Sequence, residues 1–290
     1  MIAEQVAAAF NFSVDKFPLS GPDNMKTPLY GLFRSDTNQL VGSSSVTDRY
    51  VPHTVDDVVA LCDAVEQVFD GEVHAKCHFR DGHYVIVEPT KEQRRAVFGT
   101  ADNIFPRLMI RAGYDGMAFS ASMGYYRDLC KNMHIMRSVK STSVSIRHTG
   151  NLRSNMDELI QTFRLLKESW MNLTQLIDRL EATKVNMVEF LDQLYGAPEN
   201  TQRAITIHKN RTTDIFNRLS REQMLSGRPP MSQANGFQVT AWEAFNAIQG
   251  FVQHDAQSKK EFAGEFDRII RASKDANVIK AENLLLSLSA

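Results

Sequence analysis

The spacing of apolar side chains changes near residue 150, and this change limits the folds open to the chain. Before it, apolar and polar residues alternate in short runs separated by turn signals, as in β-strands. After it, apolar residues recur at three- and four-residue steps from Leu159 through Leu173 to Leu180, the spacing of an amphipathic helix. The pattern predicts an α+β fold. An N-terminal mixed or antiparallel sheet with a crossing helix precedes a C-terminal half rich in long helices.

Turn signals place the strands of the first half. Asp81-Gly82 lies between two alternating runs, which predicts a β-hairpin, and a second Asp-Gly pair separates "IFPRLMIRAGY" from "GMAFSASMGYY". A further hairpin is predicted where "PLYGLFR" and "QLVGSSSVTDRY" are joined by "SDTN". Thr54 is the expected N-cap of a helix over residues 55–69.

Helical periodicity accounts for the rest of the chain. The long helix is expected to break near Thr183–Asn186, before a short helix that ends at Gly196 and another over Thr201–Ser226. We therefore predict an α+β core domain over 1–150 and a helical region over 151–290, packed on the core or on a neighbouring subunit. A seam this long needs an apolar partner along its length, so a homo-oligomer formed through the long helices is expected.

Composition excludes several classes of protein. No apolar run approaches the roughly 20 residues that span a bilayer, so we expect no membrane association. The N-terminus lacks the basic segment of a signal peptide. The three cysteines include no CxxC pair, which argues against a disulfide framework and favours a reducing, cytoplasmic location.

Positive charge is concentrated in one block of the sequence. Residues 1–102 hold 9 Lys and Arg against 15 Asp and Glu, whereas residues 103–153 hold 8 against 2. Such a block indicates a polyanionic partner. The alternative is that the acidic N-terminal part packs beside it and neutralises it.

Within this block, cations and tyrosines occur in the combination that holds single-stranded nucleic acid, with cations along the backbone and rings against the bases. On a strand, Arg107 and Arg111 would point the same way. The predicted contact residues are Arg107, Arg111, Tyr114, Tyr125, Tyr126, Arg127, Lys131, Arg137, Lys140, Arg147 and Arg153. The alternative is that the tyrosines are core residues and the cations a solvated surface.

Other kinds of site have weaker sequence support. Cys130 and His134 are four residues apart and could bind a metal with His148, although a packed cysteine and a hydrogen-bonded histidine explain them more simply. No GxSxG elbow, Walker A motif or GxGxxG occurs. We therefore predict no catalytic residues, no bound metal and no cofactor, and we expect a protein that is not an enzyme.

Three segments carry a resemblance to a known family. They are the strand-turn-strand leading to "DRYVPHTVDDVVAL", "YYRDLCKNMHI" with the following "SIRHTGNLR", and "TAWEAFNAIQGFVQHD". Together they resemble a phage- and plasmid-borne family of unknown function, often labelled "phage/plasmid-like protein". The resemblance implies a mobile-element gene that acts in the cytoplasm of a bacterial host. It implies no catalytic residues.

The expected function is non-enzymatic binding or annealing of single-stranded DNA during recombination or replication of the mobile element. The alternative is an anti-defence or host-interaction protein that binds and inhibits a bacterial protein. The two predictions differ in whether the basic block is exposed or is paired with acidic residues.

Overall fold

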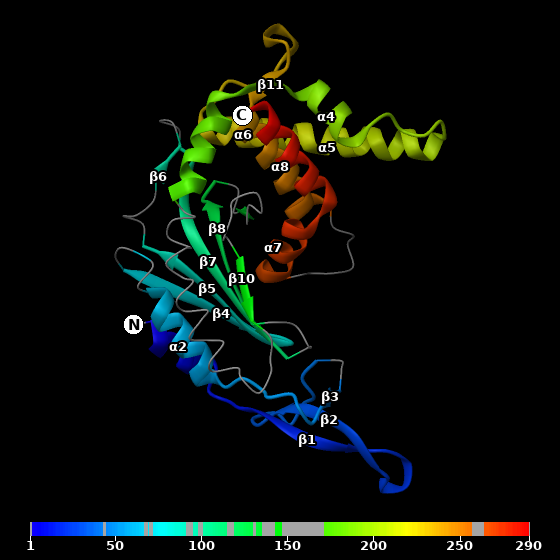
Figure 1. Ribbon diagram of the computed structural model, residues 1–290. Coiled ribbons are helices and arrows are strands. Elements are labelled where there is room, and N and C mark those ends of the chain that lie inside the picture. The colour runs from blue at the N-terminus through cyan, green and yellow to red at the C-terminus, as the bar shows by residue number, and fades with distance from the viewer. Residues whose placement is uncertain are drawn as a thin grey trace. The chain divides into compact units, whose positions relative to one another are not determined.

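The computed structural model describes residues 2–42, 45–66, 69, 72–90, 95–97, 101–114, 119–129, 132–134, 143–146, 171–256 and 264–289. The fold is α+β (Figure 1). Contacts divide the chain into two compact units that are interleaved in sequence. The first comprises residues 1–93, 106–124 and 141–169, and the second comprises residues 94–105, 125–140 and 170–290. By contrast, the sequence predicts a single boundary at residue 150.

An antiparallel sheet forms the centre of the first unit. Its order is β10-β8-β7-β5-β4, and the bounds are β4 (Val73–Phe79), β5 (Gly82–Pro89), β7 (Asn103–Gly113), β8 (Phe119–Arg127) and β10 (Ser143–Ile146). The hairpin predicted at Asp81-Gly82 is confirmed. A Cβ atom on Gly82 would lie 2.3 Å from the Ala112 carbonyl oxygen, so only glycine lets β7 approach this closely.

Helices α1 (Ile2–Ala9) and α2 (Val55–Glu66) contribute to the core on one face of this sheet. Thr54 begins α2 as predicted, because its hydroxyl accepts a hydrogen bond from the Asp57 amide and the Asp57 carboxylate accepts one from the Thr54 amide. Val58, Leu61 and Val65 of α2 are fully buried. Side chains of β4, β5, β7 and β8 at alternate positions complete this core.

A smaller sheet, in the order β1-β2-β3, extends from the N-terminal segment: β1 (Val14–Ser20), β2 (Lys26–Arg34) and β3 (Val46–Thr47). The hairpin predicted at "SDTN" is confirmed, because the Arg34 and Val41 amides donate to the Gln39 and Leu32 carbonyls and Phe33 pairs with Leu40. In the described part of the strand predicted over residues 39–50, Gln39 to Val41 and β3 are paired with β2. Gly42 interrupts the pairing with φ of 75°, a left-handed conformation that a regular strand does not contain.

The second unit is mainly helical. Its elements are α4 (Met187–Tyr195), α5 (Gln202–Ser226), α6 (Ala241–Gly250), the π-turn η4 (Phe251–Asp255), α7 (Glu265–Lys274) and α8 (Ala276–Leu288). The predicted helix break is confirmed by β11 (Lys184–Asn186), which pairs with β12 (Gln238–Thr240). The short strands β6 (Arg95–Ala96) and β9 (Met133–His134) pair with the parts of β7 and β8 that belong to this unit.

Part of the predicted apolar seam is visible in this unit. Residues 171–182 are helical, and Leu173, Ile177 and Leu180 are buried in a core that includes Trp242. The described end of the seam therefore packs within the chain itself. The earlier seam positions, Leu159, Phe163, Leu166 and Trp170, lie outside the described residues.

Candidate functional site

Arg107 lies on the sheet face opposite α2 and is 1% exposed. Its Nε donates to Glu88 Oε2 at 2.6 Å on the neighbouring strand, while Lys76 and His74 of β4 reach Glu88 Oε1 at 3.0 and 2.7 Å. Burial acts to raise the pKa of Glu88, but the charges of Arg107 and Lys76 outweigh it, so the pKa lies below its ordinary value. Arg107 thus neutralises a buried carboxylate.

Arg111 lies on the same face as Arg107, as strand alternation predicts, and is half-buried. Its Nε donates to the Tyr84 hydroxyl at 3.0 Å, and its guanidinium lies 5.5 Å from the centroid of that ring. Arg111 therefore packs against β5, the strand that pairs with its own.

Tyr114 belongs to an aromatic cluster in the core of the first unit. Its hydroxyl donates to the His53 carbonyl at 2.8 Å, and its ring stacks on the His53 imidazole at 4.1 Å. The His53 Nε2 and His83 Nδ1 atoms are 2.9 Å apart. Burial, with a smaller effect of the Arg34 charge, lowers the pKa of His83 to about 3, so this imidazole is neutral at pH 7.

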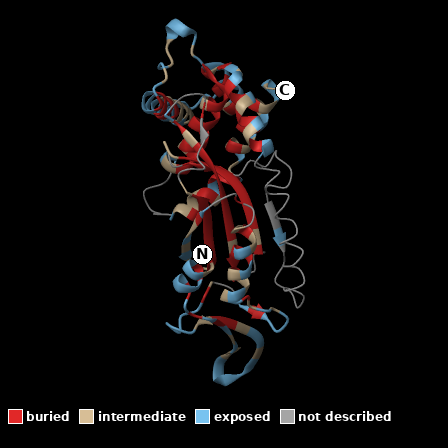
Figure 2. Ribbon diagram, turned by 90° about the vertical axis from the view of Figure 1, so that its left-hand side faces the viewer, coloured by how far each residue is buried: buried red, intermediate tan, exposed pale blue. Residues whose placement is uncertain are grey.

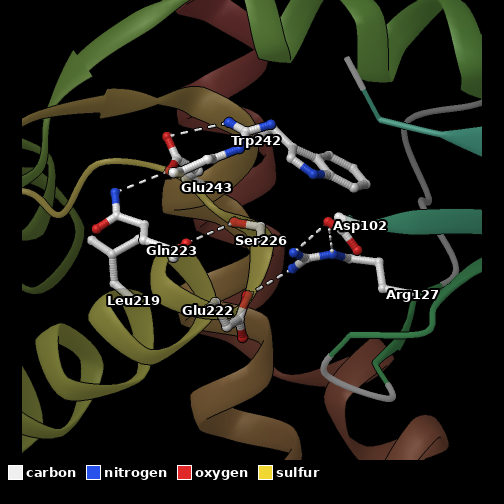
Figure 3. Close-up of a pocket in the computed structure, with 9 residues that line it drawn as sticks. Asp102, Arg127, Leu219, Glu222, Gln223, Ser226, Trp242 and Glu243 are labelled. Carbon is white, nitrogen blue, oxygen red and sulfur yellow. Dashed lines mark hydrogen bonds and ion pairs between the residues drawn. The ribbon is translucent and has the colours of Figure 1, made fainter. Parts of the chain in front are cut away.

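Arg127 lies at the centre of a buried ion-pair network in the second unit (Figure 3). Its Nε donates to Asp102 Oδ2 at 2.8 Å, and its Nη1 donates to Glu222 Oε2 at 2.7 Å. The guanidinium also lies 5.6 Å from the centroid of the Trp242 ring. Arg127 therefore connects β8 to α5 and α6.

The network continues along α5. Arg218 contacts Glu222 at 3.2 Å and donates to Asp255 at 2.8 Å. A Cβ atom on Gly250 would lie 2.1 Å from Arg218 Nε, so the absence of a side chain there lets Arg218 cross α6. The cavity beside Arg127 is about 10 Å³, room for about one water molecule and not for a substrate. We interpret the network as structural.

The paired tyrosines are also interior residues. Tyr125 is fully buried, and its ring centroid lies 4.9 Å from that of Trp242. The ring centroids of Tyr126 and Phe105 are 5.1 Å apart. Two of the segments that carry the family resemblance thus pack against each other. A further contact between them is the bond that Gln249 Nε2 donates to the Met133 carbonyl at 2.9 Å.

The predicted metal ligands are only partly described. His134 is 2% exposed, its Nε2 lies 3.3 Å from Glu282 Oε2, and its ring meets Phe245 edge-on at 4.7 Å. Cys130 and His148 lie outside the described residues. Within the described part of the chain, no group of three or more His, Cys, Asp or Glu side chains could hold a metal.

Six of the predicted nucleic-acid contact residues lie in the described part of the chain. Arg107, Tyr114, Tyr125, Tyr126 and Arg127 are buried, so in this structure they present no surface to a nucleic acid. The reason is that carboxylates and aromatic rings distant in sequence surround them. Arg111, the other described member, is half-buried against Tyr84. The remaining predicted contacts lie outside the described residues: Lys131, Arg137, Lys140, Arg147 and Arg153.

An exposed basic surface occurs elsewhere, on the first half of α5, which projects away from α6 and α8 (Figure 1). We call residues 202–213 the α5 arm. Arg203 and Lys209 are exposed, and Arg211 is half-buried with its guanidinium 4.7 Å from the centroid of the Tyr195 ring. Among the described residues, none of these three cations forms an ion pair with a carboxylate.

The sequence contained a signal for the α5 arm that composition alone did not reveal. No Asp or Glu occurs between Glu199 and Asp214, although residues 154–290 as a whole are close to neutral. The first turn of α5 also lacks an acidic residue and holds Arg203, which the helix dipole disfavours. A charge count over a short window would have found this segment.

The described helices include none that is long and apolar enough to cross a membrane. No curated protein and no solved structure matches the chain. Residues 43–285 match a family model described as "Domain of unknown function (DUF932)". The match covers two of the segments that carry the resemblance in full and the first from residue 43 onward, and it spans well over half of the chain, so the chain belongs to the DUF932 family.

Proposed function

We propose that the protein binds single-stranded nucleic acid without chemical modification and that the α5 arm is a contact surface. The observation that supports this proposal is an exposed, acid-free helical segment with three cations that lack carboxylate partners among the described residues. Unpaired exposed cations can replace the counterions of a phosphate backbone, whereas Arg107 and Arg127 are already neutralised.

Apolar and aromatic side chains close to these cations favour a single-stranded over a duplex nucleic acid. Ile205 and Ile207 are 41% and 47% exposed on the α5 arm, and the Arg211 guanidinium stacks near the Tyr195 ring. Unpaired bases have free faces that pack on apolar, aromatic or guanidinium surfaces. Because duplex bases are stacked on each other, they gain less from these side chains.

The proposed setting is the cytoplasm of a bacterial host, where the protein would act in recombination or replication of a phage or plasmid. Annealing additionally requires that two strands be held near each other, which a homo-oligomer would provide. These parts of the proposal rest on the family resemblance and on the expected self-association of the long helices.

Fluorescence anisotropy with a labelled 30-nucleotide single strand and the matching duplex tests the proposal. If the arm neutralises three phosphates, it contributes a log–log salt slope of about −2 for a single strand. A fourfold rise in salt concentration would then reduce the arm's contribution to the association constant about 20-fold. The triple variant Arg203→Ala, Lys209→Ala, Arg211→Ala should bind more weakly, with a slope shallower by about 2.

A matched control removes the same charge from other exposed sites of the second unit through Lys184→Ala, Arg221→Ala and Lys274→Ala. The control should retain the affinity and salt slope of the unchanged protein. Equal loss in both variants would reduce the effect to net charge and would contradict a contact at the α5 arm. Absence of single-strand binding by the unchanged protein at low salt would refute the proposed function.

The second candidate function is docking to a host protein, including inhibition of a defence factor. One observation favours it specifically. Large apolar side chains are exposed together on the β1–β3 sheet, among them Phe17 at 53% and Leu40 at 52% exposure. This surface supports a protein partner.

A further inference from the structure

The β1–β3 sheet has one face in the core and one face toward solvent. Val14, Leu32 and Val46 point into the core of the first unit. Side chains at alternate positions of the strands point to the other face, which includes Phe17 and Leu29. Figure 2 shows the strands of this region largely in the colours of exposed and intermediate residues.

The outer face is apolar and continuous. The Phe17 and Phe33 ring centroids are 5.9 Å apart. A Cβ atom on Gly31 would lie 2.7 Å from the Phe33 ring and 3.1 Å from both Leu19 and Leu40, so these side chains close over the glycine. We call the surface formed by Phe17, Leu19, Leu29, Phe33 and Leu40 the outer face.

An apolar solvent side is unusual for a sheet that has only one buried side. The solvent side of an antiparallel sheet normally carries polar residues, and a contiguous apolar patch indicates a binding surface. Single exposed apolar residues need no explanation, but here Phe17, Leu29 and Leu40 are exposed on the same face as the half-buried Leu19 and Phe33. The outer face therefore has the character of a binding surface.

The geometry favours a helix as that partner. Three strands span two interstrand spacings, about 10 Å, which equals the diameter of an α-helix with its side chains. Strand addition at the β1 edge is disfavoured because Pro18 lacks an N–H and the register shifts between Pro18 and Ser20. Five side chains are also far fewer than the roughly 20–30 residues per side of a stable dimer interface.

We infer that the outer face binds one amphipathic helix of a partner protein. Its apolar residues would recur at i, i+3, i+4 and i+7 and lie over Phe17, Leu29 and Phe33. Asp15 is exposed on the same face at its inner end, so a Lys or Arg at the matching end of the helix would complement it. This inference is independent of nucleic-acid binding and specifies the surface of the second candidate function.

The test uses two labelled 14-residue peptides of identical Leu, Lys and Gln composition. One has its leucines along a single helical stripe, and the other has them dispersed around the helix. Anisotropy with the full chain should show binding of the striped peptide only. The double variant Phe17→Asp, Leu29→Asp should bind it at least tenfold more weakly, since both side chains would be covered on binding.

The matched control is Met224→Asp, Leu225→Asp, which places the same charges on exposed apolar residues of the second unit. This control should bind the striped peptide as the unchanged chain does. Equal binding of both peptides, unchanged affinity of the Phe17→Asp, Leu29→Asp variant, or no binding would each overturn the inference. If sedimentation velocity shows dimers that this double variant abolishes, the occupant is a second copy, which also overturns it.

Discussion

Replacing Arg107 with methionine tests whether a buried guanidinium holds the Glu88 carboxylate within the sheet. Methionine preserves much of the apolar volume but leaves Glu88, 5% exposed, with Lys76 and His74 as its partners among the described residues. These two are 46% and 41% exposed, and exposed pairs contribute about 0–1 kcal/mol each. Breaking a buried ion pair lowers the free energy of unfolding by about 3–5 kcal/mol. Because Lys76 and His74 remain, we expect Arg107→Met to lose about 3 kcal/mol at pH 7, the low end of this range.

The assay is urea unfolding followed by circular dichroism between pH 4 and pH 7. In the unchanged protein, the pKa of Glu88 is below its ordinary value of 4.5. Its contribution to stability is therefore complete above pH 4.5 and is lost as the pH falls through the folded-state pKa. In Arg107→Met, Glu88 remains buried but loses the main charge that opposes the effect of burial, so the pKa of Glu88 should rise above 4.5. The loss of stability caused by ionised Glu88 in this variant should therefore grow as the pH rises.

The difference in unfolding free energy between the two proteins should therefore be largest at pH 7 and should narrow toward pH 4. The control is Lys76→Met, which removes an exposed partner of the same carboxylate and should cost less than about 1 kcal/mol. A loss below about 0.5 kcal/mol in Arg107→Met, or a loss independent of pH, would refute the assignment of a buried, charged Glu88.

Two further predictions concern packing in each unit. The pKa of His83 is lowered to about 3, so stability should be full above pH 6.5 and should fall by about 2 kcal/mol between pH 7 and pH 5 through this group. His83→Phe, which suits the neighbouring rings of Phe10 and Phe12, should remove that part of the pH dependence in urea titrations; an unchanged profile would contradict it. Gly250→Ala should destabilise the second unit by about 1–3 kcal/mol, because the methyl group would collide with Arg218. An unchanged thermal midpoint for Gly250→Ala would show that Arg218 moves aside at no cost.

Local features of the sequence predicted much of the secondary structure. The Asp81-Gly82 pair predicted its hairpin because a tight antiparallel turn needs these residue types at adjacent positions. The break before Asn186 was visible because helical periodicity stops there, and the Asn186 side chain caps α4. By contrast, the described part of the strand expected over residues 39–50 is paired only in two short pieces, since Gly42 adopts a left-handed conformation between them.

Burial of the basic block could not be read from the same patterns. Alternation correctly places Arg107 and Arg111 on one sheet face, but it does not tell whether that face meets solvent. The partners are remote in sequence: Glu88 is 19 residues from Arg107, and Glu222 is 95 residues from Arg127. A charge count over 103–153 therefore included arginines that are neutralised inside the protein.

The sequence by itself determined the α+β class and the order of most strands and helices along the chain, because these depend on neighbours a few residues apart. Only the tertiary structure decided which charges and apolar groups face water. It buried Arg107 and Arg127 and exposed Phe17, because burial depends on which distant segments pack together. Burial determines whether a cation neutralises a carboxylate inside the protein or remains available to a partner outside it.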